Sequence, residues 1–200
     1  MMTNYWLLCL FALLAYLAGS IPSGYLISKG RGVDIRKVGS GNIGGTNVSR
    51  TLGFKWGALV GVLDFFKSFI PAYFALRFIQ TDWQALLVSI MPVIGHIYPV
   101  WLRFKGGKGV STIFGILMAY FGFIFFLIWF VVWYLAVKVV KLMSLVNLIM
   151  SLFFPLLFWF SSYRSLIYVT FGAALCVLVW WSHRSNIKRL LAGNENLTNY

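Results

Sequence analysis

Long apolar segments alternate with short polar ones along this chain. The apolar segments are Tyr5–Ser28, Trp56–Phe78, Trp83–Leu102, Val110–Val137, Leu145–Phe160 and Ser165–Trp181. An α-helix crosses the hydrocarbon core of a bilayer with about 20 residues, which is close to the length of most of these segments. The pattern therefore predicts an all-α protein, a polytopic bundle of transmembrane helices.

Basic residues are divided unequally among the polar segments. With residues 30–55 placed in the cytoplasm, fourteen of the 17 lysines and arginines fall on that side, Arg77 and Arg164 fall on the other, and Lys67 lies within a span. Cytoplasmic loops of membrane proteins carry such an excess. The assignment requires Val110–Val137 to cross twice, as two short helices that divide near residues 120–122. It predicts seven spans, with the N-terminus outside and the C-terminus in the cytoplasm.

Composition also indicates a membrane environment. Hydrophobic residues make up 60% of the 200 and charged residues only 10%, which leaves too little polar surface to cover a soluble globule. The net charge of +13 would suggest nucleic acid in a soluble protein. Here the charges lie in short loops between spans, so we expect no nucleic-acid partner. They orient the chain in the membrane, bind anionic substrates, or do both. We expect residues 1–200 to form a single membrane domain.

Two features of the chain receive structural interpretations. Cys9 and Cys176 lie inside apolar segments, without the Cys/His spacing of a metal site or a disulfide framework. The segment from Leu7 to Ala18 resembles the apolar part of a signal peptide, but no Lys or Arg precedes it and the apolar pattern continues to Ile27. We expect this segment to be retained as the first span.

A cluster of small residues interrupts the first span at Gly19–Gly24. Two glycines, two serines and Pro22 within six residues predict a break or kink in the helix. In lipid, such a break persists only where it faces protein or water. Close helix packing or a functional site that includes Ser20 would explain the cluster.

A second cluster, Gly39–Asn47, is glycine-rich and is followed by Arg50. Glycines let backbone N–H groups approach an anion closely and form a nest. Arg50 offers a bidentate fork for a phosphate. Hydrogen-bonding side chains are interleaved with the glycines, namely Ser40, Asn42, Thr46 and Asn47. A flexible linker is the alternative, but this composition favours a phosphate-binding loop.

A third cluster joins Gly95–Pro99 to a glycine-lysine loop that runs from Phe104 to Gly109 and opens a helix. The N–H groups and dipole at a helix start favour a bound anion. This is not a Walker loop, because the required strand is missing and Gly109 follows Lys108. A turn whose charges only orient the chain is the alternative. His96 either hydrogen-bonds within the bundle or joins the site.

Polar residues gather again where the last span ends, at Ser182–Arg189. His183 and Asn186 are three residues apart, so on a continuing helix they would share a face. Beside a basic site, this pair is a candidate for substrate binding. Ser144 is a weaker candidate.

Asp64 and Lys67 lie inside the second span at helical spacing. Charges in lipid are costly unless they pair, so we expect the two side chains to face the bundle together. The pair is either structural or functional.

The predicted topology places at least two anion-binding loops at one membrane face. The chain has only four acidic residues, and no carboxylate pair or serine–histidine–acid order is evident. An enzyme acting on a phosphorylated amphiphile fits this pattern, and so does a transporter of glycerol phosphate or phosphate. The lack of a convincing internal repeat argues mildly against a secondary transporter.

Three of these stretches resemble the bacterial acyl-phosphate glycerol-3-phosphate acyltransferases, the PlsY family: Gly19–Gly24, Gly39–Asn47, and Gly95–Pro99 with Phe104–Gly109. The tail around His183 and Asn186 is also similar. The resemblance implies a seven-helix enzyme of the bacterial inner membrane with a cytoplasmic active site. It implies that a fatty acyl group passes from acyl phosphate, not acyl-CoA or acyl carrier protein, to position 1 of sn-glycerol 3-phosphate. The products would be lysophosphatidic acid and phosphate, at the first step of phospholipid synthesis.

From the motifs and the resemblance together we predict a set of site residues and expect no cofactor or metal. The residues predicted to be catalytic are His183, Asn186, Lys108 and Arg50. Those predicted to bind substrate are Ser40, Asn42, Gly41, Thr46, Asn47, Lys105, Gly106, Gly107, Gly109, Ser144, Ser20 and His96. An acyl phosphate carries its own leaving group, so catalysis would rest on positioning and charge stabilisation. The proton acceptor is either His183 or the phosphate of the donor, and we favour the phosphate.

Overall fold

The computed structural model describes residues 5–198, and all regular structure in that range is helical. The α-helices are α1 (Tyr5–Ser20), α2 (Ser23–Gly30), α3 (Gly45–Leu52), α4 (Phe54–Phe78), α5 (Asp82–Ile97), α6 (Val110–Val140), α7 (Met143–Ser151), α8 (Phe154–Trp159), α9 (Leu166–Ser182) and α10 (Arg184–Leu191), with 3-10 turns η1 (Ile35–Lys37) and η2 (Val100–Leu102). Residues 1–4, whose lack of charge entered the prediction of a retained first span, and residues 199–200 of the basic tail lie outside the described range. The all-α prediction is confirmed.

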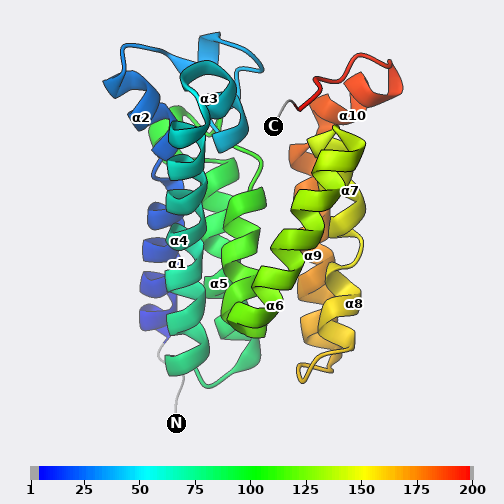
Figure 1. The fold of residues 1–200 in the computed structure, drawn as a ribbon. Coiled ribbons are helices and arrows are strands. Elements are labelled where there is room, and N and C mark those ends of the chain that lie inside the picture. The colour runs from blue at the N-terminus through cyan, green and yellow to red at the C-terminus, as the bar shows by residue number, and fades with distance from the viewer. Residues whose placement is uncertain (1–4, 199–200) are drawn as a thin grey trace. The chain divides into compact units, whose positions relative to one another are not determined.

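The chain forms two compact units, and helix α6 runs from one into the other. We call Met1–Tyr120 the N-terminal unit and Phe121–Tyr200 the C-terminal unit. In the N-terminal unit α1 and α4 both pack against α5, and α3 packs against α4 (Figure 1). In the C-terminal unit α7 and α8 pack against α9.

Glycines bring α1 and α5 into backbone contact. A Cβ on Gly19 would lie 2.2 Å from the carbonyl oxygen of Pro92, and a Cβ on Gly95 would lie 2.2 Å from that of Tyr16. Neither position can hold a larger residue without separating the helices. The close-packing interpretation of Gly19 is therefore confirmed.

The predicted interruption of the first span is also present. Helix α1 ends at Ser20, Pro22 lies at the start of α2, and the two segments together run from Tyr5 to Gly30. Gly24 of α2 packs so closely that a Cβ would lie 1.9 Å from the carbonyl oxygen of Ile43. The cluster thus combines a helix break with close packing.

The segment 30–55, predicted to be a loop, is partly helical. It contains η1 and the two-turn helix α3, which packs on α4. The helix forms because its apolar face, with Val48 at its centre, is buried together with Ile35, Ile43 and Val60. The glycines that suggested a loop precede this helix, and its apolar spacing is too short to stand out in the sequence.

The C-terminal unit contains a second departure from the prediction. Leu145–Phe160, expected as one helix, is divided into α7 and α8 by a turn at Leu152–Phe153. Pro155 lies in the first turn of α8, a position that suits proline because the N–H there needs no helical partner. The helix α8 then packs tightly on α9, where a Cβ on Gly172 would lie 2.8 Å from the carbonyl oxygen of Phe154.

Length and composition identify four segments within residues 5–198 that can span a membrane. They are Tyr5–Gly30, Phe54–Phe78, Asp82–Leu102 and Val110–Val140. Helices α9 and α10, bent by 61°, would together supply a fifth. The long helix α6 has non-helical backbone at Gly122, with φ 82° and ψ 175°. This break lies where the sequence predicted the fourth apolar segment to divide.

Candidate active site

The glycine-rich loop before α3 is organised by one buried amide, that of Asn47. Its Oδ1 accepts a hydrogen bond from the backbone N–H of Ser40 at 3.0 Å, and its Nδ2 donates to the carbonyl oxygens of Ile35, Val38 and Asn42 at 3.2, 3.0 and 2.9 Å. Asn47 is only 2% exposed. The sequence predicted a substrate-binding role for Asn47, whereas these four side-chain bonds hold the loop together.

Two glycines give this loop its curvature. Gly39 and Gly41 have φ of 59° and 69°, in the left-handed region that favours glycine. Between them, Ser40 is exposed, and its hydroxyl accepts from the N–H of Asn42 at 3.4 Å. The side chain of Asn42 accepts from the N–H of Gly44 at 2.8 Å, which fixes the turn that leads into α3. The loop therefore presents Ser40 and the adjacent backbone on its outer side.

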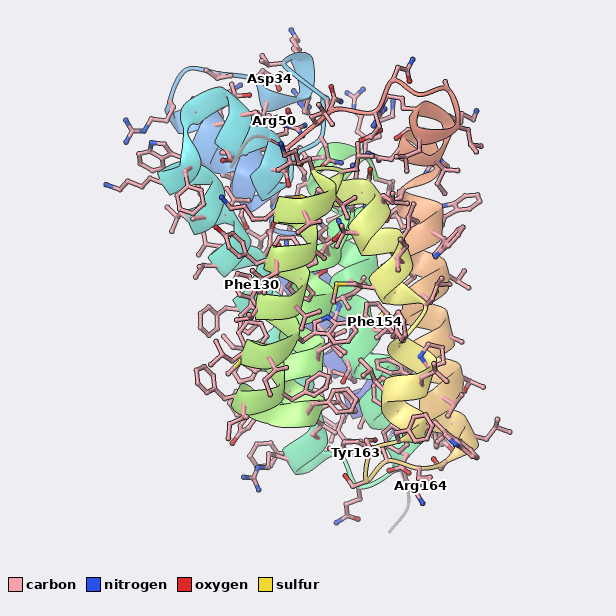
Figure 2. All side chains as sticks on the ribbon, turned by 45° about the vertical axis from the view of Figure 1, so that its right-hand side comes forward. Asp34, Arg50, Phe130, Phe154, Tyr163 and Arg164 are labelled. Atoms are coloured by element: carbon pink, nitrogen blue, oxygen red, sulfur yellow. The ribbon has the colours of Figure 1, made fainter. Side chains whose placement is uncertain are left out.

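Helix α3 places the other predicted residues of this loop. Thr46 lies in its first turn and is half-buried, and Arg50 lies in its last turn and is exposed. Figure 2 shows Arg50 and Asp34 at the same end of the N-terminal unit. Arg50 is thus carried by a short helix, not by a flexible loop.

The glycine-lysine loop is bonded to the end of α5. The N–H groups of Gly106 and Gly107 donate to the carbonyl oxygens of Ile97 and His96, at 3.1 and 3.0 Å. Upstream, Arg103 and Phe104 both have positive φ, 52° and 60°. Consecutive left-handed residues other than glycine are strained, and such strain is concentrated at functional sites.

The loop ends at the start of α6, as the sequence predicted. Gly109 has φ of 81°, and its carbonyl accepts from the N–H of Ile113 at 2.8 Å and from the hydroxyl of Thr112 at 2.6 Å. The first N–H groups of a helix have no partner inside it and favour an anion. Lys108 is half-buried beside this helix start, and Lys105 is exposed.

Two predicted substrate-binding residues of the N-terminal unit are buried. Ser20 is fully buried, and its hydroxyl has no hydrogen-bond partner among residues 5–198. His96 is 5% exposed, and its Nε2 lies 2.0 Å from where a Cβ on Gly107 would be. The imidazole therefore lies directly beneath the glycine-lysine loop.

Charge pairs account for some of the basic residues near these loops. The guanidinium of Arg36 donates to both carboxylate oxygens of Asp34, at 2.9 and 2.8 Å. This pairing lowers the pKa of the Asp34 carboxyl to about 2. The guanidinium of Arg31 lies 3.8 Å from the ring centroid of Trp56, a cation–π contact. Arg36 is thus held by a neighbour in the loop, and Arg31 by a residue of the first turn of α4.

In the C-terminal unit the histidine site differs from the prediction. His183 and Asn186 do not lie on one continuing helix, because α9 ends at Ser182 and α10 begins at Arg184 after a bend of 61°. Helical spacing alone gave no sign of this bend. Both side chains are nevertheless buried, at 1% and 3% exposed. His183 Nδ1 lies 2.8 Å from the carbonyl oxygen of Val179, so this nitrogen carries a proton and donates.

Glu195 is a residue of this site that the sequence did not reveal. It accepts from Asn186 Nδ2 at 2.7 Å through one oxygen and from Arg189 Nε at 2.8 Å through the other. The chain after α10 folds back to make these contacts, and the N–H of Thr198 donates to the carbonyl oxygen of Lys141 at 2.8 Å. The only sequence signal for it was that Glu195 is the one acidic residue in the otherwise basic segment after Ser182.

Two predicted residues of the C-terminal unit have polar atoms with no partner in the described part of the chain. The Oδ1 atom of Asn186 and the hydroxyl of Ser144, in the first turn of α7, are both buried without a hydrogen bond. Buried polar atoms are nearly always satisfied, so such atoms need an explanation such as a ligand.

Among residues 5–198, no group of three or more His, Cys, Asp or Glu side chains is arranged to hold a metal ion.

Comparison with known proteins identifies the family. The family described as "Glycerol-3-phosphate acyltransferase" matches residues 9–193. The glycerol-3-phosphate acyltransferase of Aquifex aeolicus is 41% identical over 189 residues, covering 91% of this chain and 94% of the relative. That of Symbiobacterium thermophilum is 42% identical over 190 residues, covering 92% of each.

Solved structures agree with the sequence comparison. The crystal structure of PlsY, an integral membrane glycerol 3-phosphate acyltransferase, in its glycerol 3-phosphate form is similar with a TM-score of 0.88 and 38% identity over 96% of both chains. Its lysophosphatidic acid form gives a TM-score of 0.86 at 37% identity, over 96% of this chain and 95% of the other. With the family match across nearly the whole length, the chain belongs to the PlsY family of integral membrane glycerol-3-phosphate acyltransferases.

Proposed function

We propose that this protein transfers a fatty acyl group from acyl phosphate to the 1-hydroxyl of sn-glycerol 3-phosphate, at the first step of phospholipid synthesis. The hydroxyl oxygen bonds to the acyl carbon, and the bond between that carbon and the phosphate oxygen breaks. The departing phosphate takes the hydroxyl proton, so that lysophosphatidic acid and hydrogen phosphate are the products. No cofactor enters this balance.

The pair of glycine-rich, basic loops in the N-terminal unit carries the proposal. Both substrates bring a phosphate, and the unit offers two loops built for anions, one before α3 with Arg50 and one before α6 with Lys108. The solved relatives described in glycerol 3-phosphate and lysophosphatidic acid forms support the acceptor and the product. We assign Ser40, Asn42, Lys105 and the glycines of both loops to these phosphates.

The C-terminal unit by itself holds polar side chains that suit hydroxyl groups. The unused Oδ1 of Asn186 and hydroxyl of Ser144 suit the hydroxyls of a glycerol backbone. Because Nδ1 of His183 lies against the carbonyl oxygen of Val179, we assign the other ring nitrogen, Nε2, to the substrate. Glu195, which holds Asn186 in place, would act as a positioning residue.

The proton acceptor follows from the same contacts. The carboxylates of Glu195 and Asp34 are both engaged by other residues, because Glu195 bonds Asn186 and Arg189 and Asp34 bonds Arg36. A histidine base is usually supported by such a partner. We therefore assign the proton to the phosphate of the donor and an orienting role to His183.

We further propose seven spans in a single membrane domain of the bacterial inner membrane, with the N-terminus outside and the site and the C-terminus on the cytoplasmic side. The break at Gly122 supports two crossings within α6. At 1.5 Å per residue, the parts before and after Gly122 are about 18 and 27 Å long, against a hydrocarbon core of about 30 Å. The short first part would need neighbouring helices to complete its crossing.

Cysteines introduced at Lys37 and Arg164, on a cysteine-free background, should label from opposite sides, and labelling from one side would reject this topology.

One assay tests the proposed reaction. Detergent-solubilised protein is given radiolabelled glycerol 3-phosphate with acyl phosphate, acyl-CoA or acyl carrier protein as donor. We expect lysophosphatidic acid with acyl phosphate alone. Product with acyl-CoA alone would correct the donor. Uptake of glycerol 3-phosphate into proteoliposomes without product would favour a transporter.

A further inference from the structure

A buried ionic cluster lies within the spanning helices of the N-terminal unit. Asp64 and Lys67 are one turn apart on α4, and their Oδ1 and Nζ atoms are 2.9 Å apart, so the predicted pairing is confirmed. His96 of α5 places its Nδ1 3.7 Å from the same Oδ1. All three side chains are at most 7% exposed. Ionisable groups at such depth are costly and are retained where they perform a function.

The cluster touches the glycine-lysine loop through His96. One side of the imidazole faces Asp64, and Nε2, on the other, lies beneath Gly107, where a Cβ would be only 2.0 Å away. The backbone of the same residue accepts the N–H of Gly107 at 3.0 Å. The position of the imidazole therefore determines how closely Gly107 can approach the end of α5.

The same part of α4 also holds the start of α6. A Cβ on Gly115 would lie 2.3 Å from the carbonyl oxygen of Phe65, and the hydroxyl of Ser68 donates to the carbonyl oxygen of Thr112. Lys67 Nζ donates in addition to the carbonyl oxygen of Ile21, at the break between α1 and α2, at 2.9 Å. Three segments that the sequence singled out separately thus meet at one ion pair.

We propose that Lys67, Asp64 and His96 are positioning residues for the phosphate loop Gly106–Gly109. Lys67 is fixed by Ile21 and pairs with Asp64. The Asp64 carboxylate packs beside the imidazole, with Oδ1 3.7 Å from Nδ1 and without a hydrogen bond between them, and the imidazole lies beneath Gly107. A catalytic site must hold its binding groups within a fraction of an ångström, and this support would do so for the loop that carries Lys108 to the start of α6. The inference rests on the proposed function, because it assigns a support to the loop that binds a substrate phosphate.

Amide hydrogen exchange tests the support without any substrate. The amides of Gly106 and Gly107 are followed in wild type, Asp64→Asn, Asp64→Glu and His96→Gln in detergent. Loss of the support should speed their exchange by about tenfold or more, because exchange reports local opening, with partial rescue in Asp64→Glu. Ser89→Ala is the matched control, since it removes a buried hydrogen bond of α5 to Tyr120, 3.1 Å long, away from the loop.

Kinetics give a second readout. Asp64→Asn and His96→Gln should raise the Michaelis constant of a phosphate-bearing substrate by about tenfold, with a smaller fall in turnover, whereas Ser89→Ala should change stability alone. Exchange and Michaelis constants equal to those of Ser89→Ala would overturn the inference and reduce the cluster to a packing element. Failure of the proposed function would appear as wild type without product, and the exchange comparison would still decide the inference. If Asp64→Asn does not fold, the test rests on His96→Gln, which leaves the Asp64–Lys67 pair of α4 in place.

Discussion

The two units of this protein carry their candidate functional groups in different forms. In the N-terminal unit two basic side chains, Arg50 and Lys108, lie on or beside glycine-rich loops whose backbone is held by Asn47 and by the end of α5. In the C-terminal unit they are buried side chains beside breaks between helices, with His183 and Asn186 at the break between α9 and α10 and Ser144 after the break between α6 and α7. A rigid backbone that carries a cation suits a phosphate, whose charge is spread over several oxygens, whereas neutral polar side chains suit single hydroxyls.

The difference teaches where each unit is vulnerable. A backbone site is damaged by an added Cβ or by loss of its support, and it tolerates many side-chain changes elsewhere in the loop. A side-chain site is damaged by deletion of the side chain itself. The predictions below use this contrast, beginning with the largest expected effect.

Gly107→Ala should abolish most activity. The new Cβ would collide with the imidazole of His96, 2.0 Å away, and the loop must lift off its support. Displacement of a binding group by about 1 Å costs on the order of a hundredfold in catalytic efficiency. The measurement is kcat/KM beside Gly30→Ala, where a Cβ meets nothing within 4 Å. Equal activities of the two variants would show that the loop is not a rigid site.

Lys108→Ala and Arg50→Ala should each lose catalytic efficiency while folding and inserting normally. Removal of one partner of a desolvated charge contact costs about 2–5 kcal/mol, roughly thirtyfold or more. Arg50→Lys should recover little if the contact is bidentate. Lys55→Ala, an exposed basic residue outside both loops, is the control. Near-normal kinetics in both alanine variants would leave these charges only an orienting role in the membrane.

His183→Gln should raise the Michaelis constant of glycerol 3-phosphate more than it lowers turnover. Glutamine keeps hydrogen-bonding capacity but has no titratable nitrogen, so an orienting histidine is partly replaced and a catalytic base is not. His183→Ala should be the weaker of the two variants. A loss of turnover beyond about a thousandfold, with a limb missing from the pH–rate profile, would make His183 the base.

Asp34→Asn should have the smallest effect on turnover. The pKa of Asp34 is lowered to about 2 by Arg36, so its contribution to stability is present above its unfolded pKa of about 4 and is lost as the pH falls toward 2. The carboxylate therefore stays ionised throughout an assay at neutral pH and supplies no limb to the profile. Loss of the same limb of the pH–rate profile in Asp34→Asn and in His183→Gln would contradict this and support a His–Asp base.

Much of the fold could be predicted because lipid imposes simple rules on sequence. Spanning length and basic loops located the apolar helices, and small residues with Pro22 located the break in the first span. The two-turn helix α3 and the division of α7 from α8 could not be predicted from length and hydropathy. They depend on local packing of Val48 and on Pro155, signals that are short beside a 20-residue span.

The candidate site shows a similar boundary. Glycine spacing located both loops, because left-handed backbone and close packing restrict the residue types that can be used there. The function of Asn47 in holding its loop and the contact of Glu195 with Asn186 depend on tertiary contacts. The bend at His183 likewise left no mark on residue spacing. The sequence therefore located segments in which the backbone conformation restricts the residue type. It did not show which tertiary contacts the polar side chains make.

The inhibition constant of inorganic phosphate, measured on the residual activity of variants, tests the division of labour between the units most directly. Phosphate has neither a glycerol hydroxyl nor an acyl chain, so it should report on the loops alone. We predict that Lys108→Ala raises this constant by about tenfold or more, while Ser144→Ala and Asn186→Ala leave it at the wild-type value despite lower turnover. A constant that is unchanged in Lys108→Ala and raised in Asn186→Ala would contradict the account.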